Sequence, residues 1–200
     1  MPCTGPKRLV VSISPPTLWR HYFDERQPSS ANWRQKRLRV YKRDKYCCIY
    51  CGYRSKSDLH IHHANRNPAD NRIGNLETVC LMCHLILHAG YAAEVLGILD
   101  FYAVAGYPQN DIVLLTRQLR AKGMCDKQIG IALGLQDRRP FVSDPHYLAR
   151  LIGFVSSRLP SDASVSRALG TMYEKERKAI ATMDDMISEA LGQGTGQMPF

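Results

Sequence analysis

Two cysteine pairs with the same two-residue spacing constrain this chain more than any other feature. The first pair is Cys48 and Cys51, and the second is Cys80 and Cys83. Two such pairs typically supply four thiolates to one tetrahedral zinc ion. Gly52 directly follows the first pair, where the absence of a side chain permits the tight turn of a zinc knuckle. The pattern therefore predicts a small zinc-bound module in this part of the chain.

The other cysteines do not share this spacing. Five of the seven cysteines gather in the same window, whereas Cys3 and Cys125 stand alone. In a reducing cytosol such clustering favours metal binding over disulfides. Cys47 is left over, and we interpret it as a core thiol or a spare ligand. The alternative for the paired cysteines is that they are unligated thiols of an apolar core.

Histidines form a second pattern in this window, which contains five of the seven. His84 and His88 are four residues apart, so on a helix they share one face and can hold one ion. We predict His62 as the third ligand of that metal. Three neutral imidazoles leave open coordination positions, with which a catalytic metal binds a phosphate oxygen. His63 is then free to act as a general base. The alternative is that the module holds one zinc and the extra histidines lie on its surface.

Residue patterning divides the chain into four parts. Residues 1–28 are rich in proline and are expected to form an arm, in which the apolar stretch 9–13 is a candidate edge strand. Residues 29–90 are expected to contain a basic helix and then the zinc module. Residues 91–191 are expected to be helical, and residues 192–200 to be a flexible tail.

The expected elements follow from hydrophobic periodicity. The basic helix spans residues 30–43 with Ser29 or Ser30 as its cap, a short strand lies at 59–61, and a helix at 81–88 stops at Gly90. Later helices are predicted at 111–121, 126–133, 145–158 and 164–191. The predicted fold class is α+β, with a small zinc finger followed by a mainly α-helical second half.

The formal net charge of +9 is concentrated before the zinc module. A basic helix beside a metal site suits a phosphate backbone, which rewards cations through counterion release. The candidate nucleic-acid contacts are Arg34, Arg37, Lys42 and Arg43. The alternatives are a solvated helix face or an acidic protein partner. The longest apolar stretches are too short to cross a membrane, so no direct membrane insertion and a cytoplasmic location are expected.

The phrase YKRDKYCCIYCGYRSKSDLHIHHANRNPADNRIGNLETVCLMCHLILH resembles the HNH nuclease family, also called the ββα-metal or treble-clef type. The resemblance implies that His63 deprotonates water and that Asn75 orients the His63 ring through a hydrogen bond. It also implies that His62, His84 and His88 hold a second divalent metal, such as Mg²⁺, Mn²⁺, Ni²⁺ or Zn²⁺, beside the structural zinc.

Much of the chain is also similar to the IcmJ (DotN) family of type IVB secretion and conjugation systems. The similar phrases are SPPTLWRHYFDER, RDKYCCIYCGY, DNRIGNLETVC, SDPHYL and LPSDA. The resemblance implies an adaptor that docks a segment of the coupling ATPase and is recruited to the inner membrane through it. That family lacks the nuclease histidines, whereas this chain retains them. We therefore expect an adaptor of the coupling complex, with a metal-dependent HNH endonuclease acting on DNA as the alternative.

Overall fold

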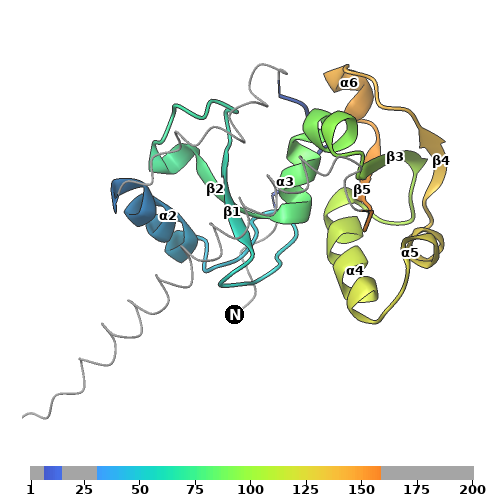
Figure 1. Cartoon of the computed structure of the whole chain (residues 1–200), viewed down its shortest axis with the longest axis horizontal. Coiled ribbons are helices and arrows are strands. Elements are labelled where there is room, and N and C mark those ends of the chain that lie inside the picture. Colours follow the sequence, from blue (N-terminus) through green and yellow to red (C-terminus); the bar gives the residue numbers. More distant parts are fainter. Residues whose placement is uncertain (1–6, 15–30, 159–200) are drawn as a thin grey trace, which may run out of the picture.

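The computed structural model describes residues 7–14 and 31–158, which form a mixed α and β structure with two small antiparallel sheets (Figure 1). One sheet has the strand order β1-β2, and the other has the order β4-β3-β5. Several predictions lie outside the described residues: most of the arm, the serine caps, the helix at 164–191 and the tail at 192–200.

The predicted basic helix is present as α2 (Ala31–Arg43). Val40 and Tyr41 are buried at its carboxyl end, and the Tyr41 hydroxyl donates to the carbonyl of Leu59 at 3.0 Å. This contact joins α2 to the first strand. Arg34, Arg39 and Lys42 of this helix are exposed, because its apolar side is narrow.

The first cysteine pair lies on the turn between α2 and the first sheet. The amide of Cys48 donates to the Tyr53 carbonyl at 2.8 Å, and that of Gly52 donates to the Cys48 carbonyl at 2.9 Å. Gly52 has a φ of +73°, a conformation that costs glycine little. The predicted role of Gly52 in a tight turn is confirmed.

Strands β1 (Leu59–His63) and β2 (Leu76–Cys80) pair in an uninterrupted antiparallel register, with Leu59 opposite Cys80. A 3₁₀ turn, η2 (Ile73–Asn75), leads into β2. Because side chains alternate along a strand, His60 and His62 share one face and His63 takes the other. Every residue of β2 is buried.

Helix α3 (Leu81–Leu87) follows β2 directly. The predicted helix at 81–88 is confirmed to within one residue, because α3 ends at the cap residue His88 (φ −116°, ψ 48°). Gly90 is not the predicted stop, since it has right-handed helical angles (φ −59°, ψ −48°) and leads into the π-helix η3 (Tyr91–Val95). Tyr91 and Ala92 are buried in this segment. Their burial carries the helical path past the glycine.

The second half is less helical than its periodicity predicts. It contains β3 (Leu99–Val104), α4 (Gln109–Ala121), α5 (Asp126–Ala132), β4 (Gln136–Arg139), α6 (Pro145–Leu148) and β5 (Ile152–Val155). The predictions of α4 and α5 are confirmed within two residues at each end, but the single helix at 145–158 is wrong. Its second part is β5, which pairs with β3 through Leu99 opposite Val155.

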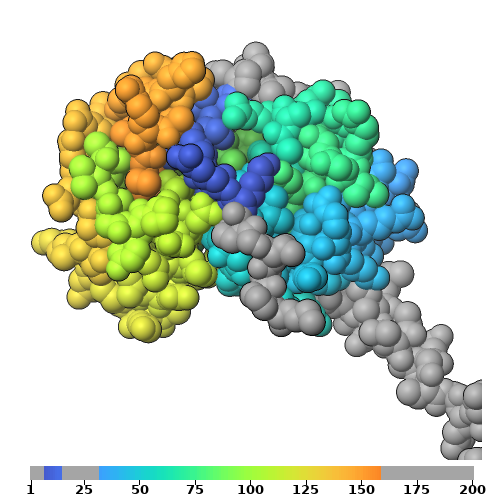
Figure 2. All heavy atoms as spheres, turned by 180° about the vertical axis from the view of Figure 1, so that it is seen from behind, coloured from blue at the N-terminus to red at the C-terminus, as the bar shows by residue number. Residues whose placement is uncertain are grey.

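Residues 7–14 run along the seam between the two halves, as the dark blue segment in Figure 2 shows. Leu9 and Val11 are buried there. The segment makes no sheet pairing, so the predicted edge strand is wrong. Its backbone bonds to the end of α3 instead, where the Ser12 amide donates to the Ile86 carbonyl and the Ala89 amide to the Ser12 carbonyl.

One apolar cluster spans both halves, from Tyr41 and Cys83 in the first to Phe101 and Val155 in the second. Among the described residues, the helices are all too short or too polar to cross a membrane.

Candidate metal centres

The four paired cysteines meet at one buried point. Cys48 and Cys51 come from the turn before β1, Cys80 ends β2, and Cys83 lies in the first turn of α3. Their sulfur atoms all lie within 4.8 Å of one another, and Cys51 Sγ is 3.6 Å from Cys80 Sγ. Sulfurs on one tetrahedral zinc are about 3.8 Å apart, given Zn–S bonds of about 2.3 Å. The donor set therefore fits one zinc ion.

The electrostatics of the four thiols also fit a cation. The hydrogen bond with Cys48, followed by those with Cys51 and Cys83, holds the pKa of Cys80 well below its ordinary value. The hydrogen bond with Cys48, followed by those with Cys51 and Cys80, holds the pKa of Cys83 well above its ordinary value. Neighbouring thiols thus share protons, and all four can ionise together only beside a positive charge.

Cys47 and Cys125 stand apart from this cluster. Cys47 is buried and disulfide-bonded, so the prediction of a core thiol or spare ligand is wrong, whereas Cys125 is an exposed free thiol at the start of α5. The two-residue spacing was the signal that separated the four cluster members from these two.

Three histidines meet at a second point. One ring nitrogen each from His62, His84 and His88 lies within 4.8 Å of the other two. His62 Nδ1 is 3.2 Å from His88 Nε2. The inward face of β1 supplies His62, while α3 and the residue after it supply the other two. As expected for residues four apart on a helix, His84 and His88 therefore lie on the same side and face one point.

Burial favours the neutral form of these imidazoles, which is the form that binds metals. Burial, followed by the charges of His63 and Arg66, lowers the pKa of His62 to about 3. Burial is likewise the main cause that lowers the pKa of His84 and of His88 well below the ordinary value. A donor set of three neutral imidazoles suits a divalent ion with open positions.

His60 is an imidazole beside this group that sequence reasoning left without a role. It is buried, and its ring centroid lies 5.7 Å from that of His84. The alternation of His60 and His62 along one strand face was a signal that places both against α3.

His63, the candidate base, lies on the opposite face of β1. Its ring stacks parallel to Trp33 of α2, with the centroids 6.1 Å apart. Its Nε2 lies 3.0 Å from Asn71 Oδ1. The ring is half-buried at the end of the strand, where the Arg66 amide donates back to the His63 carbonyl at 2.8 Å.

The structure does not bring Asn75 to His63 as the resemblance implies. The Asn75 amide group donates to Asn65 Oδ1 at 2.9 Å and to the Asp70 carbonyl at 2.8 Å, while its own oxygen accepts from the Asn65 amide. Asn75 therefore fixes the loop before β2. Asn71, four residues earlier in the same polar loop, is the asparagine whose side chain contacts His63.

The four candidate nucleic-acid contacts on α2 differ in their surroundings. Arg34 and Lys42 are exposed. The Arg37 guanidinium donates to the Tyr41 hydroxyl at 3.2 Å. Arg43 pairs with Asp44 and also donates to the Ile73 and Leu76 carbonyls, so its guanidinium tethers α2 to the start of β2.

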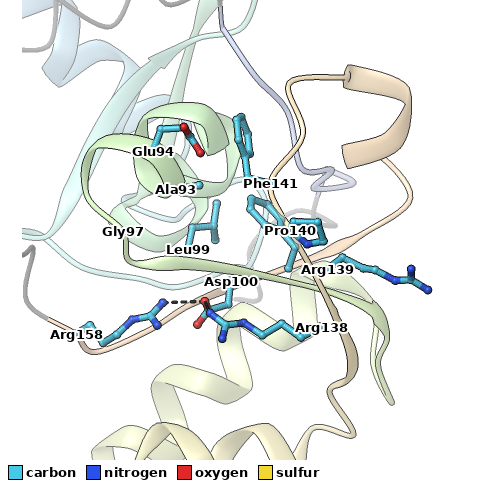
Figure 3. A pocket seen from close by; sticks show the side chains of 11 residues that line it. Ala93, Glu94, Gly97, Leu99, Asp100, Arg138, Arg139, Pro140, Phe141 and Arg158 are labelled. Atoms are coloured by element: carbon cyan, nitrogen blue, oxygen red, sulfur yellow. Dashed lines mark hydrogen bonds and ion pairs between the residues drawn. The ribbon is translucent and has the colours of Figure 1, made fainter.

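A pocket of about 460 Å³ lies in the second half, away from both clusters (Figure 3). Its floor carries Asp100, which accepts from Arg138 and from Arg158, the latter at 2.8 Å. Glu94 and Phe141 lie at its upper side. None of the predicted site residues lines this pocket.

This chain is similar in part to a known protein. No family model matches the chain. The type 4 apparatus protein DotN of Legionella pneumophila is 33% identical to this chain over 75 residues. The similarity covers 36% of this chain and 32% of DotN, so the chain spans about a third of the length of that relative. The similarity is consistent with the IcmJ (DotN) resemblance, while the HNH-type treble clef stays a prediction.

Proposed function

We propose that this chain is a zinc-stabilised adaptor of a type IV secretion or conjugation apparatus, related to the IcmJ (DotN) family. The similarity to DotN, a type 4 apparatus protein, is the observation that carries the proposal. The buried cysteine cluster supports it, because one zinc on four thiolates makes a rigid platform from a short chain. The proposed partner is the coupling ATPase, which would recruit the chain to the inner membrane.

Co-purification tests this adaptor role. A tagged coupling ATPase from the same organism should retain the chain through washing, and should retain the His63→Ala variant equally well. Removing one imidazole at the end of β1 does not remove a docking surface. Loss of the wild-type chain under conditions that preserve its fold would contradict the proposal, and selective loss of His63→Ala would place the interface at the histidines.

A second candidate function is metal-dependent hydrolysis of a phosphodiester bond in DNA. The convergence of His62, His84 and His88 favours it, since an adaptor platform does not require a second group of ligands. A divalent ion held there would supply Lewis-acid stabilisation of the leaving oxygen. Those three side chains would hold the ion, and the exposed Arg34 and Lys42 would contact phosphates along the DNA.

His63 is the proposed general base of this hydrolysis, and its contacts suit the role. With Asn71 Oδ1 as the acceptor, the His63 ring carries its proton on Nε2. The lone pair then lies on Nδ1, which is the atom that would take a proton from water. Stacking on Trp33 holds the ring plane in place. Asn71 thus takes over the orienting role that the resemblance assigns to Asn75.

Nicking of supercoiled DNA tests the hydrolysis. Wild type, His63→Ala and the matched control His146→Ala, which removes an exposed histidine of α6, are incubated with Mg²⁺, Mn²⁺, Ni²⁺ or Zn²⁺ in turn. His63→Ala should lose about 10² to 10⁴ in rate, as expected for a general base, while His146→Ala should match wild type. Equal nicking by wild type and His63→Ala with every metal would remove this candidate and leave the adaptor.

A further inference from the structure

Ser14 contacts the histidine cluster from outside, on the side of His88 that faces away from His62. Its hydroxyl oxygen lies 3.2 Å from His88 Nδ1, and the other ring nitrogen of His88 lies 3.2 Å from His62 Nδ1. Ser14 is only 3% exposed. The serine therefore touches the ring nitrogen of His88 that does not face His62.

The backbone around Ser14 is fixed by contacts that do not involve His88. The Ser12 hydroxyl donates to the Leu87 carbonyl at 2.8 Å, and the Ala89 amide donates to the Ser12 carbonyl at 2.9 Å. The Arg66 guanidinium donates to the Ile13 carbonyl at 3.0 Å. These bonds hold the segment against the end of α3 and against the loop after β1, so that Ser14 is placed before any ion binds.

The position of the proton on His88 decides whether this residue can be a ligand. A neutral imidazole has one N–H and one lone pair, and the group bonded to one nitrogen determines which form is present. If Nδ1 carries the proton and donates to Ser14, the lone pair of Nε2 faces His62 and His84. A serine hydroxyl can either donate or accept, so Ser14 remains a partner for either form of the ring.

We propose that Ser14 is a positioning residue of the histidine centre, which fixes the orientation of His88 and accepts its Nδ1–H so that Nε2 can hold a divalent ion. The inference rests on the second function proposed above. Ser14 acts through His88 and does not itself contact the ion. Outer partners of this kind typically change metal affinity by about 10- to 100-fold.

Metal titration of two matched serine variants tests this role. Ser14→Ala removes the contact with His88, whereas Ser12→Ala removes a hydroxyl from the same segment that bonds only a backbone carbonyl. Co²⁺ is titrated into zinc-loaded protein, and its visible d–d absorption is followed. We expect Ser14→Ala to bind Co²⁺ about 10- to 100-fold more weakly than wild type. Ser12→Ala should bind within about twofold of wild type, and Ser14→Thr, which keeps the hydroxyl, should recover most of the loss.

A second readout follows the proton itself. In zinc-saturated, ¹⁵N-labelled wild type, the Nδ1–H of His88 should give a slowly exchanging imidazole signal, which Ser14→Ala should lose. Equal Co²⁺ affinity for wild type and Ser14→Ala would overturn the role of Ser14 but not the histidine centre. If Ser12→Ala and Ser14→Ala lost the same Co²⁺ affinity, the role of Ser14 would also be overturned, because packing of the segment would explain the effect. If wild type takes up no ion beyond the cysteine zinc, the histidine centre fails together with this inference.

Discussion

At the residue scale, we expect the loss of a thiol to unfold the protein at the buried cysteine cluster and to leave its stability unchanged at the exposed Cys125. We predict that Cys51→Ser yields unfolded or insoluble protein without bound zinc, because structural zinc contributes about 10 kcal/mol of folding free energy in small zinc modules. Cys125→Ser is the matched control. Its side chain caps α5, a position at which serine is favoured, so this variant should keep wild-type stability.

Metal analysis and thermal unfolding of the two variants check this prediction. Wild type and Cys125→Ser should each carry at least one tightly held zinc per chain. A folded Cys51→Ser protein, or folded wild type free of metal, would contradict the assignment of the four cysteines to a structural zinc.

Individual site residues could be predicted where spacing alone determines their position. The four cysteines and the three clustered histidines meet as their spacing indicates, because a knuckle turn, a strand face and a helix face are local geometries. Asn71 and Arg43 could not be predicted in this way. The contacts of Asn71 with His63 and of Arg43 with the Ile73 carbonyl depend on how the 64–72 loop folds back, which no periodicity encodes.

At the element scale, the second half shows where periodicity misleads. Leu148, Leu151, Ile152 and Val155 have helical spacing, yet the last two belong to β5. Pairing with β3, far earlier in the chain, makes these two residues part of a strand rather than a helix. The position of Gly153 also favours glycine, since a Cβ there would come within 3.3 Å of the side chains of Leu99 and Val11. Such long-range packing overrides local preference, whereas α2, α4 and α5 were predictable because each presents an apolar stripe to its neighbours.

Two side chains of α4, Gln109 and Arg120, bond to the backbone of β5, and the buried Gln109 gives an element-scale prediction. The buried Gln109 side chain donates to the Gly153 carbonyl at 2.9 Å and accepts from the Gly153 amide at 2.7 Å. Gln109→Ala leaves both backbone groups buried without these partners, so we expect a loss of about 2 to 4 kcal/mol in the free energy of unfolding. Gln118→Ala, on the exposed side of the same helix, should change it by less than about 0.5 kcal/mol.

Urea denaturation of the two glutamine variants, at constant zinc, measures this difference. Similar midpoints for Gln109→Ala and Gln118→Ala would mean that water replaces the lost partner, and that packing rather than this hydrogen-bonded pair holds α4 on the sheet.

At the scale of the whole molecule, the zinc module and the second half share one core, which sequence patterning divided at residue 90. Helix α3 packs against β5, and Arg117 of α4 stacks over Tyr53 beside the first knuckle, with its guanidinium carbon 3.7 Å from the ring centroid. Asn110 of α4 also donates to the carbonyls of Lys7 and Tyr50. A change of composition along the chain marks a boundary in sequence, but contacts between the halves form only on folding.

This shared core predicts that zinc removal unfolds more than the module that binds the ion. Cys83 lies on α3, and α3 packs against β5, so loss of the ion should loosen the β4-β3-β5 sheet together with the β1-β2 sheet. Hydrogen exchange measured with and without a zinc chelator should show the amides of Phe101 and Phe154 losing protection alongside those of β2, and added zinc should restore both. A sheet that keeps its protection while β2 loses it would show that the second half folds by itself.

Calorimetry of the zinc-loaded protein tests the shared core independently. A common core should give one cooperative unfolding transition, whereas two separate transitions would mean that the halves unfold independently.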